Sequence, residues 1–157
     1  MPSWSYSFKP KEPDKTAIIS GRDLRISPKH AREVCAAIRG LKLDEAKRLL
    51  EEVVKGRRPI AFRRYHGKVG HRRGLQGWPS GRYPKKASKT ILKILEALEA
   101  NASDKGLDTE RLKIVHAAAY PGMKIKRYIP RAMGRATPRF ETLCHVEIVL
   151  EQTGGET

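Results

Sequence analysis

The chain has 157 residues, a formal net charge of +16 and a hydrophobic content of 39%. This length fits one ordinary domain, and the apolar content suffices for a core although it is below the roughly 45–50% of average globular chains. No segment approaches the roughly 18 apolar residues of a membrane span, and the start, MPSWSYSFKPKEPDK, lacks the pattern of a signal peptide.

The first 15 residues predict an extended arm, because three of them are proline, which opposes regular structure. Aromatic residues alternate within this arm. Their rings either pack against the folded body or stack on RNA bases, and the sequence favours packing while leaving both readings open for Trp4, Tyr6 and Phe8.

A strand and a helix follow the arm. Residues 16–26, TAIISGRDLRI, predict a strand with Gly21 as a candidate bulge. Ser27 is then the expected N-cap and Pro28 the first residue of a helix that ends at Gly40. Apolar residues recur in it at i, i+3, i+4 and i+7, which predicts one buried face.

Two further amphipathic helices are predicted at residues 43–54, with Asp44 as cap, and at about residues 84–101. Each has a single apolar stripe and must bury it against another element. The residues expected in the core from the helices and from the last strand are Val34, Ile38, Leu49, Leu50, Ile94, Leu98, Val146 and Ile148.

After a loop at residues 104–108, the apolar period changes from helical spacing to two, which predicts two half-buried strands. The first places Leu112, Ile114, His116 and Ala118 on one face. The second, from Phe140 to Glu151, alternates apolar residues with glutamates expected to face solvent. With the earlier strand these give an α+β fold: a small three-stranded antiparallel sheet packed on three α-helices.

The positive charge is concentrated in two acid-free segments. Residues 55–89 hold twelve Lys or Arg and residues 123–139 hold six, so the other 105 residues sum to −2. Such concentration raises repulsion in the compact state unless a polyanion neutralises it. Nucleic acid is the commonest such partner and an anionic membrane the second.

The segment MKIKRYIPRAMGRATPRF, residues 123–140, lies between the last two predicted strands and is therefore the far end of a long hairpin. At about 3.3 Å per residue, half of its length would carry the tip roughly 30 Å beyond the body. This segment has no apolar face that could fold it back, so we expect it to need an external partner to become ordered.

The other basic segment, residues 55–86, combines six Gly and three Arg–Arg pairs with Phe62, Tyr65, Trp78 and Tyr83. Cations neutralise phosphates, glycines permit close approach, and aromatic rings stack on unpaired bases. We expect this insertion to be disordered in the free chain and to order on RNA. A helix-turn-helix DNA reader is disfavoured, because the second predicted helix exposes four acidic residues.

Enzymatic signals are weak, and no catalytic residue, cofactor, metal or small-molecule substrate is predicted. His66 and His71 lack the i, i+4 spacing of a metal pair, and HGKVGHRRG lacks the spacing of a phosphate-binding loop. Cys144 and His145 are strand neighbours that point to opposite faces. Cys35 and Cys144 fall on apolar faces, which indicates buried free thiols in a reducing compartment.

Three stretches resemble a known family: RISPKHAREVCAAIRG, ILKILEALEANASDKGLD and GMKIKRYIPRAMGRATPRFETLCHVEIVLE. They are similar to the universal large-subunit ribosomal protein family twenty-two, over residues 16–152, with helix starts, loop and hairpin in the same order. The R-I-S-P helix opening and the hairpin tip at residues 127–136 carry the resemblance. The long insertion and the YSF arm favour an archaeal type.

This resemblance implies one ribosomal-protein domain, residues 1–157, with an arm (1–15), a basic insertion (55–86) and an extended hairpin (121–140). It implies a cytoplasmic constituent of the large ribosomal subunit that binds 23S ribosomal RNA and neighbouring ribosomal proteins, supports assembly and does no catalysis. It also implies that the hairpin tip lines the polypeptide exit tunnel, beside the nascent chain. A free regulatory RNA- or DNA-binding module is the alternative.

The expected site residues form three sets. The cations expected at ribosomal RNA are Arg25, Lys29, Arg57, Arg58, Arg63, Arg64, Lys68, Arg72, Arg73, Arg82, Lys85, Lys86, Lys89, Lys124, Lys126, Arg127, Arg131, Arg135 and Arg139. The candidates for base stacking are Phe62, Tyr65, Trp78, Tyr83 and Tyr128. The resemblance adds the tip residues expected to line the tunnel: Ile129, Pro130, Arg131, Ala132, Met133 and Gly134.

Overall fold

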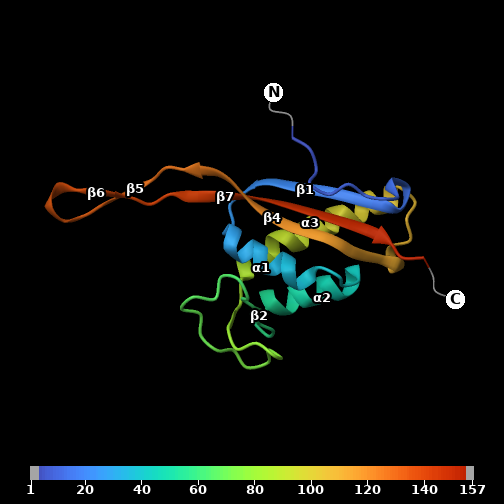
Figure 1. Ribbon diagram of the computed structural model, residues 1–157, viewed down its shortest axis with the longest axis horizontal. Coiled ribbons are helices and arrows are strands. Elements are labelled where there is room, and N and C mark those ends of the chain that lie inside the picture. The colour runs from blue at the N-terminus through green and yellow to red at the C-terminus, as the bar shows by residue number, and fades with distance from the viewer. Residues whose placement is uncertain (1–3, 155–157) are drawn as a thin grey trace.

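The computed structural model describes residues 4–154 and has a three-stranded antiparallel sheet at its centre. The strand order is β1 (Thr16–Leu24), β7 (Glu141–Gln152) and β4 (Leu112–Ile125), so the last strand lies in the middle. The three helices cover one face of this sheet (Figure 1). The predicted α+β class is confirmed, and the early strand lies in one sheet with the last two, where it pairs with β7. Residues 1–3 of the predicted arm lie outside the described residues.

A bulge in β4 changes which side chains face the core. Ile114 pairs with Leu150 and His116 pairs with Val149, which leaves Val115 as the extra residue. A one-residue shift moves every following side chain to the opposite face. Ala117 is therefore fully buried, while His116 and Ala118 are only half-buried. The prediction that His116 and Ala118 share the face of Leu112 and Ile114 was wrong for this reason.

The helices are α1 (Pro28–Ile38), α2 (Leu43–Val54) and α3 (Lys85–Asp104), each within a few residues of its predicted range. Ser27 occupies the N-cap position of α1, but its side chain makes no capping hydrogen bond. Asp44 does not cap α2 as predicted. It lies in the first turn, and Lys42 is the N-cap. A carboxylate in the first turn still favours the helix dipole.

One hydrophobic core lies between the helices and the sheet. It contains the predicted residues except Leu49, which is only half-buried at its edge. Gly40 donates its N–H to the carbonyl of Ile114 at 2.8 Å, and Ile114 donates to Leu41 at 2.9 Å. These two bonds fix the α1–α2 connection to the edge strand β4.

The core also includes Ile60 and Phe62 from the basic insertion, so that insertion is part of the folded body.

The N-terminal arm covers part of the other face of the sheet. Glu147 of β7 accepts hydrogen bonds from the N–H groups of Ser7 and Phe8, each at 3.1 Å, and the Phe8 ring stacks on His116 with centroids 5.1 Å apart. Glu147 is consequently only 6% exposed, which corrects the expectation that it faces solvent. The packing alternative holds for Phe8, whereas Trp4 and Tyr6 remain exposed.

Candidate nucleic-acid interface

The predicted hairpin extends well beyond the sheet as a narrow two-stranded ribbon (Figure 1). β4 and β7 stay paired as far as Ile125 and Glu141, and β5 (Tyr128–Pro130) then pairs with β6 (Ala136–Pro138). Every residue from 126 to 140 is exposed, so no part of the body covers this ribbon. Its order comes from ladder bonds and from the edge-to-face contact of Tyr128 with Phe140, at 6.1 Å between centroids.

The ribbon ends in a tight turn at Ala132–Gly134. Met133 and Gly134 both have left-handed backbone angles, with φ of 60° and 65°. Such angles are unfavourable for most side chains and routine only for glycine. The Met133 side chain is 91% exposed at the far end of the molecule. The residues expected at the tunnel wall thus lie together at this tip, and their contact with a nascent chain stays a prediction.

The positive charge of the ribbon is balanced only at its base. Glu141 accepts two hydrogen bonds from Arg25, at 3.1 and 2.8 Å, and lies 3.8 Å from Arg127. The Arg25 hydrogen bond holds the pKa of Glu141 below its ordinary value, so this carboxylate stays ionised. Within residues 4–154, the four other cations of the ribbon, and Lys124 just before it, have no carboxylate in salt-bridge range: Lys124, Lys126, Arg131, Arg135 and Arg139. Phe140, expected on the apolar face of the strand, is 45% exposed instead.

The basic insertion has a defined structure that one buried carboxylate holds in place. Glu33 of α1 is 1% exposed. It accepts the backbone N–H groups of Arg63, Arg64 and Tyr65 at 3.1, 3.0 and 3.2 Å, and the guanidinium of Arg32 at 3.0 Å. Two short strands, β2 (Ile60–Ala61) and β3 (Gly81–Arg82), close the base of the insertion. The expected disorder of this segment in the free chain was therefore wrong.

The pKa of Glu33 reflects two opposing effects. Burial raises the pKa of the carboxyl, but the backbone hydrogen bonds from Arg63, Tyr65 and Arg64 and the side-chain bond from Arg32 together lower it further than burial raises it. The pKa is therefore below its ordinary value. Glu33 stays ionised at neutral pH and binds the turn at residues 63–65 as a charged acceptor, which makes these bonds stronger than neutral ones.

The aromatic candidates of the insertion divide into one core residue and three surface residues. Phe62 is 1% exposed and packs in the core beside His30, so it cannot stack on a base. The other three are half-buried, with Trp78 donating its indole N–H to the Phe62 carbonyl at 2.9 Å. Each has a guanidinium 5.6–5.8 Å from its ring centre: Arg63 at Trp78, Arg64 at Tyr65 and Arg72 at Tyr83.

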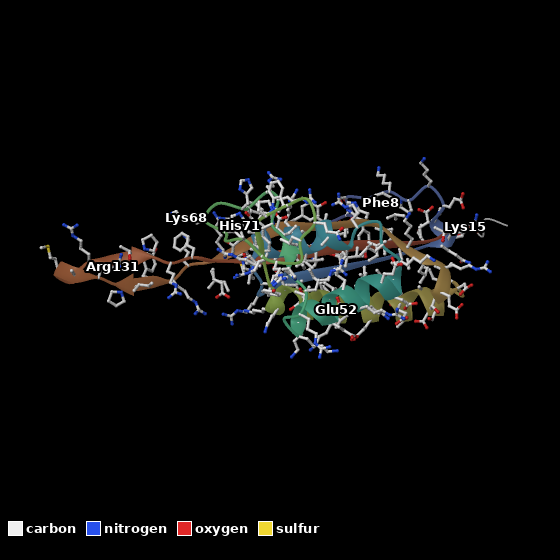
Figure 2. The ribbon with its side chains drawn as sticks, turned by 90° about the horizontal axis from the view of Figure 1, so that it is seen from below. Phe8, Lys15, Glu52, Lys68, His71 and Arg131 are labelled. Carbon is white, nitrogen blue, oxygen red and sulfur yellow. The ribbon has the colours of Figure 1, made fainter. Side chains whose placement is uncertain are left out.

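Both acid-free segments lie at the same end of the molecule. The insertion occupies the helix side of the body at the end from which the hairpin emerges (Figure 1). In Figure 2, Arg131 lies on the hairpin, and Lys68 and His71 lie on the insertion. All nineteen predicted cations are exposed. The fold therefore brings charge from distant parts of the chain to one end of the molecule.

Two residues between these two segments were not predicted from the sequence to belong to the site. Arg32 and Tyr120 line a cleft between the insertion and the hairpin base, together with the predicted Lys29, Arg64 and Lys124. Arg32 looked like an ordinary solvent-facing helix residue, and Tyr120 like a strand residue at the edge of the hairpin. No signal in the sequence places them side by side, because the segments are 88 residues apart (120 less 32).

Among residues 4–154, no group of three or more His, Cys, Asp or Glu could hold a metal ion, and none of their helices is long and apolar enough to cross a membrane. Cys35 and Cys144 are free and buried as predicted. Burial raises the pKa of the Cys35 thiol to about 12 and that of Cys144 to about 11, so neither is a thiolate at neutral pH.

Comparison with known proteins assigns a family to this architecture. The family described as Ribosomal protein L22p/L17e matches residues 19–151. The large ribosomal subunit protein uL22 of Methanocaldococcus jannaschii is 56% identical over 140 residues, 89% of this chain and 90% of that protein. Its counterpart in Ignicoccus hospitalis is 54% identical over 157 residues, 97% of this chain and 99% of that protein. The uL22 protein of Archaeoglobus fulgidus is 56% identical over 147 residues, 94% of this chain and 95% of that protein.

Proposed function

The chain belongs to the L22p/L17e family of ribosomal proteins, and from this premise we propose that it binds large-subunit ribosomal RNA through its hairpin and basic insertion. Membership makes it a structural constituent of the large ribosomal subunit in the cytoplasm, and not an enzyme. We further propose that residues 1–157 act as one unit. In this unit the helices and the sheet form a scaffold, and the two acid-free segments neutralise phosphates of the RNA.

The observation that carries this proposal is the exposed ribbon at residues 126–140. It holds five cations and no acid, and the body covers none of it. A solvated ribbon with this charge is repelled by the rest of a +16 chain. Neutralisation by phosphates removes the repulsion, and release of condensed counterions adds favourable free energy. Irregular folded RNA suits such loops and ribbons better than a regular DNA groove does.

The tip has a second proposed role. Ile129, Pro130, Ala132, Met133 and Gly134 carry no charge, although they lie between cations. We infer that the flanking arginines hold RNA while these small and apolar residues form part of the wall of the polypeptide exit tunnel, beside the nascent chain. The exposure of Met133 supports this role, since this apolar residue is 91% exposed to solvent.

The proposal is tested by neutralising Arg127, Arg131 and Arg135 together as glutamines. All three are exposed, so the fold and melting temperature should be unchanged while incorporation into large subunits falls, as measured by sucrose-gradient profiling. A matched control makes the same charge change on the body, at Arg48, Lys93 and Lys113, which are exposed and lie on α2, α3 and β4.

The control variant should assemble normally. Normal incorporation of the hairpin variant would reject the role of the hairpin in RNA binding. Recovery of the unaltered protein mostly off ribosomes, on one defined operator or message, would instead identify a free regulator.

A further inference from the structure

A large open cleft lies where the insertion, the start of α1 and the base of the hairpin meet. Its volume is about 970 Å³, close to the upper end of the roughly 300–1,000 Å³ typical of ligand sites. Four separate segments line it, at residues 25–32, 64–65, 119–124 and 141–142, with Lys86 from α3. A concave site of this size accepts a small group that protrudes from a strand, whereas a duplex is too wide to enter.

The lining of the cleft is strongly cationic. It contains one carboxylate, Glu141, which Arg25 already binds through two hydrogen bonds. A further cation, Arg32, is paired with Glu33 at 3.0 Å. Among the described residues, the remaining four cations have no carboxylate within salt-bridge distance: Lys29, Arg64, Lys86 and Lys124. The cleft therefore has an excess of positive charge that its own acidic groups do not compensate, which suits a phosphate.

An aromatic wall accompanies this charge. The Tyr65 ring is half-buried, and both Lys29 Nζ and Arg64 Cζ lie 5.7 Å from its centre. Glu33 fixes the backbone at Tyr65 through the N–H at 3.2 Å, so this side of the cleft is formed before any ligand arrives. Tyr120 lines the same cleft and is 39% exposed. A ring beside unpaired cations matches a base with its adjoining phosphate.

We propose that this cleft binds one unstacked nucleotide of an RNA strand. The base lies against Tyr65, and the phosphate contacts Lys29, Arg64 and Lys124. The inference rests on the proposed function, since the strand belongs to large-subunit ribosomal RNA. It adds a specific site that would fix how the insertion and the hairpin sit relative to each other on the RNA.

The test compares Tyr65→Leu with Phe8→Leu in binding to deproteinised 23S ribosomal RNA over a series of salt concentrations. Phe8 is the control, since its half-buried ring packs on His116 and does not line the cleft. Loss of one stacked base weakens binding by about 5- to 150-fold. Tyr65→Leu should show this loss with an unchanged salt slope, and Phe8→Leu should bind normally.

A second variant keeps the test independent of the fold around Tyr65. Lys29→Ala with Lys124→Ala removes two exposed cations from the one proposed phosphate contact, and should lower the magnitude of the slope of log K against log salt by about 0.7, the share of one single-strand phosphate. If the unaltered protein binds the RNA while all variants match it, the cleft proposal is wrong and the proposed function stands. If the unaltered protein does not bind the RNA, the proposed function itself fails.

A separate arm distinguishes an RNA strand from a free nucleotide. Adenosine monophosphate is titrated into the unaltered protein and Tyr65→Leu, with amide chemical shifts of residues 25–32 and 119–124 as the readout. The RNA proposal predicts at most weak, millimolar binding of the mononucleotide. Micromolar binding that Tyr65→Leu abolishes, with RNA affinity unaffected, would assign the cleft to a free nucleotide and overturn the proposal.

Discussion

Replacing Glu33 with Gln tests whether one buried carboxylate holds the basic insertion in place before any partner binds. Oε1 of Glu33 accepts the N–H groups of Arg64 and Tyr65, and Oε2 accepts that of Arg63. Gln has nearly the same shape but keeps an oxygen at only one of the two positions. At the other position its NH₂ group faces a backbone N–H, so a donor meets a donor.

The cost follows from these contacts. A donor left without a partner costs about 1–3 kcal/mol, and the surviving hydrogen bonds lose the roughly twofold strengthening that an ionised acceptor gives. The neutral amide, however, is cheaper to bury than a carboxylate, which offsets part of the loss. We expect a net destabilisation of the insertion of about 2–3 kcal/mol, which increases its opening equilibrium about 30- to 150-fold.

Amide hydrogen exchange followed by NMR measures this change residue by residue. In the unaltered free protein, the amides of Arg63, Arg64 and Tyr65 should be protected, and in Glu33→Gln they should exchange faster by that factor. Amides of β7 should be much less affected. Glu96→Gln is the control, because Glu96 is exposed on α3 and the substitution removes the same charge. Fast exchange of these amides in the unaltered protein would refute the reasoning, as would equal protection in Glu33→Gln.

Three further predictions concern the same segment. The pKa of Glu33 in the folded chain is below its ordinary value of 4.5, so the stability that this carboxylate contributes is complete above about pH 4.5 and is lost as the pH falls through the lower folded-state pKa. The protection of the amides of residues 63–65 against hydrogen exchange should therefore fall with acid in the unaltered protein. Glu33→Gln should not show this pH dependence. Phe62→Ala should lower the free energy of unfolding by about 3–5 kcal/mol in chemical denaturation. Met133→Ala, at a position that is 91% exposed, should change it by less than about 0.5 kcal/mol. Equal effects would contradict the burial of Phe62. Gly81→Ala places a Cβ 2.9 Å from the Ile60 carbonyl oxygen and 2.5 Å from Leu75 Cδ1, so it should cost about 1–3 kcal/mol and speed amide exchange in β2 and β3; an unchanged melting temperature would show that the strands shift freely.

Local sequence patterns were sufficient to predict most of the helices and strands of the scaffold. Helical spacing of apolar residues located α1, α2 and α3, and alternation located β4 and β7, because a one-sided apolar face is required for burial in either element. Patterns failed at Val115, where one extra residue reverses the two faces of β4. A bulge depends on how two strands pair, so the sequence of one strand does not reveal it.

The candidate site was likewise only partly predictable from the sequence. The hairpin cations and the exposed ribbon were predictable, because an acid-free segment between two strands has no means of folding back on a cationic body. The order of the insertion was not predictable. Glu33 precedes the turn that it holds by 30 residues, and in sequence it resembles any solvent-facing helix glutamate. Phe62 likewise looked like one aromatic among several in a basic loop, and only its place beside α1 made it a core residue.

The sequence by itself thus determined the scaffold class, the two cationic segments and the absence of acids within them, since composition and periodicity are local properties of the chain. Only the tertiary structure decided that both segments lie at one end, that Glu33 and Glu147 are buried acceptors, and that Lys29, Tyr65 and Lys124 surround one cleft. The physical reason is that these contacts join residues far apart in the chain. Their geometry exists only after the core has packed the helices on the sheet.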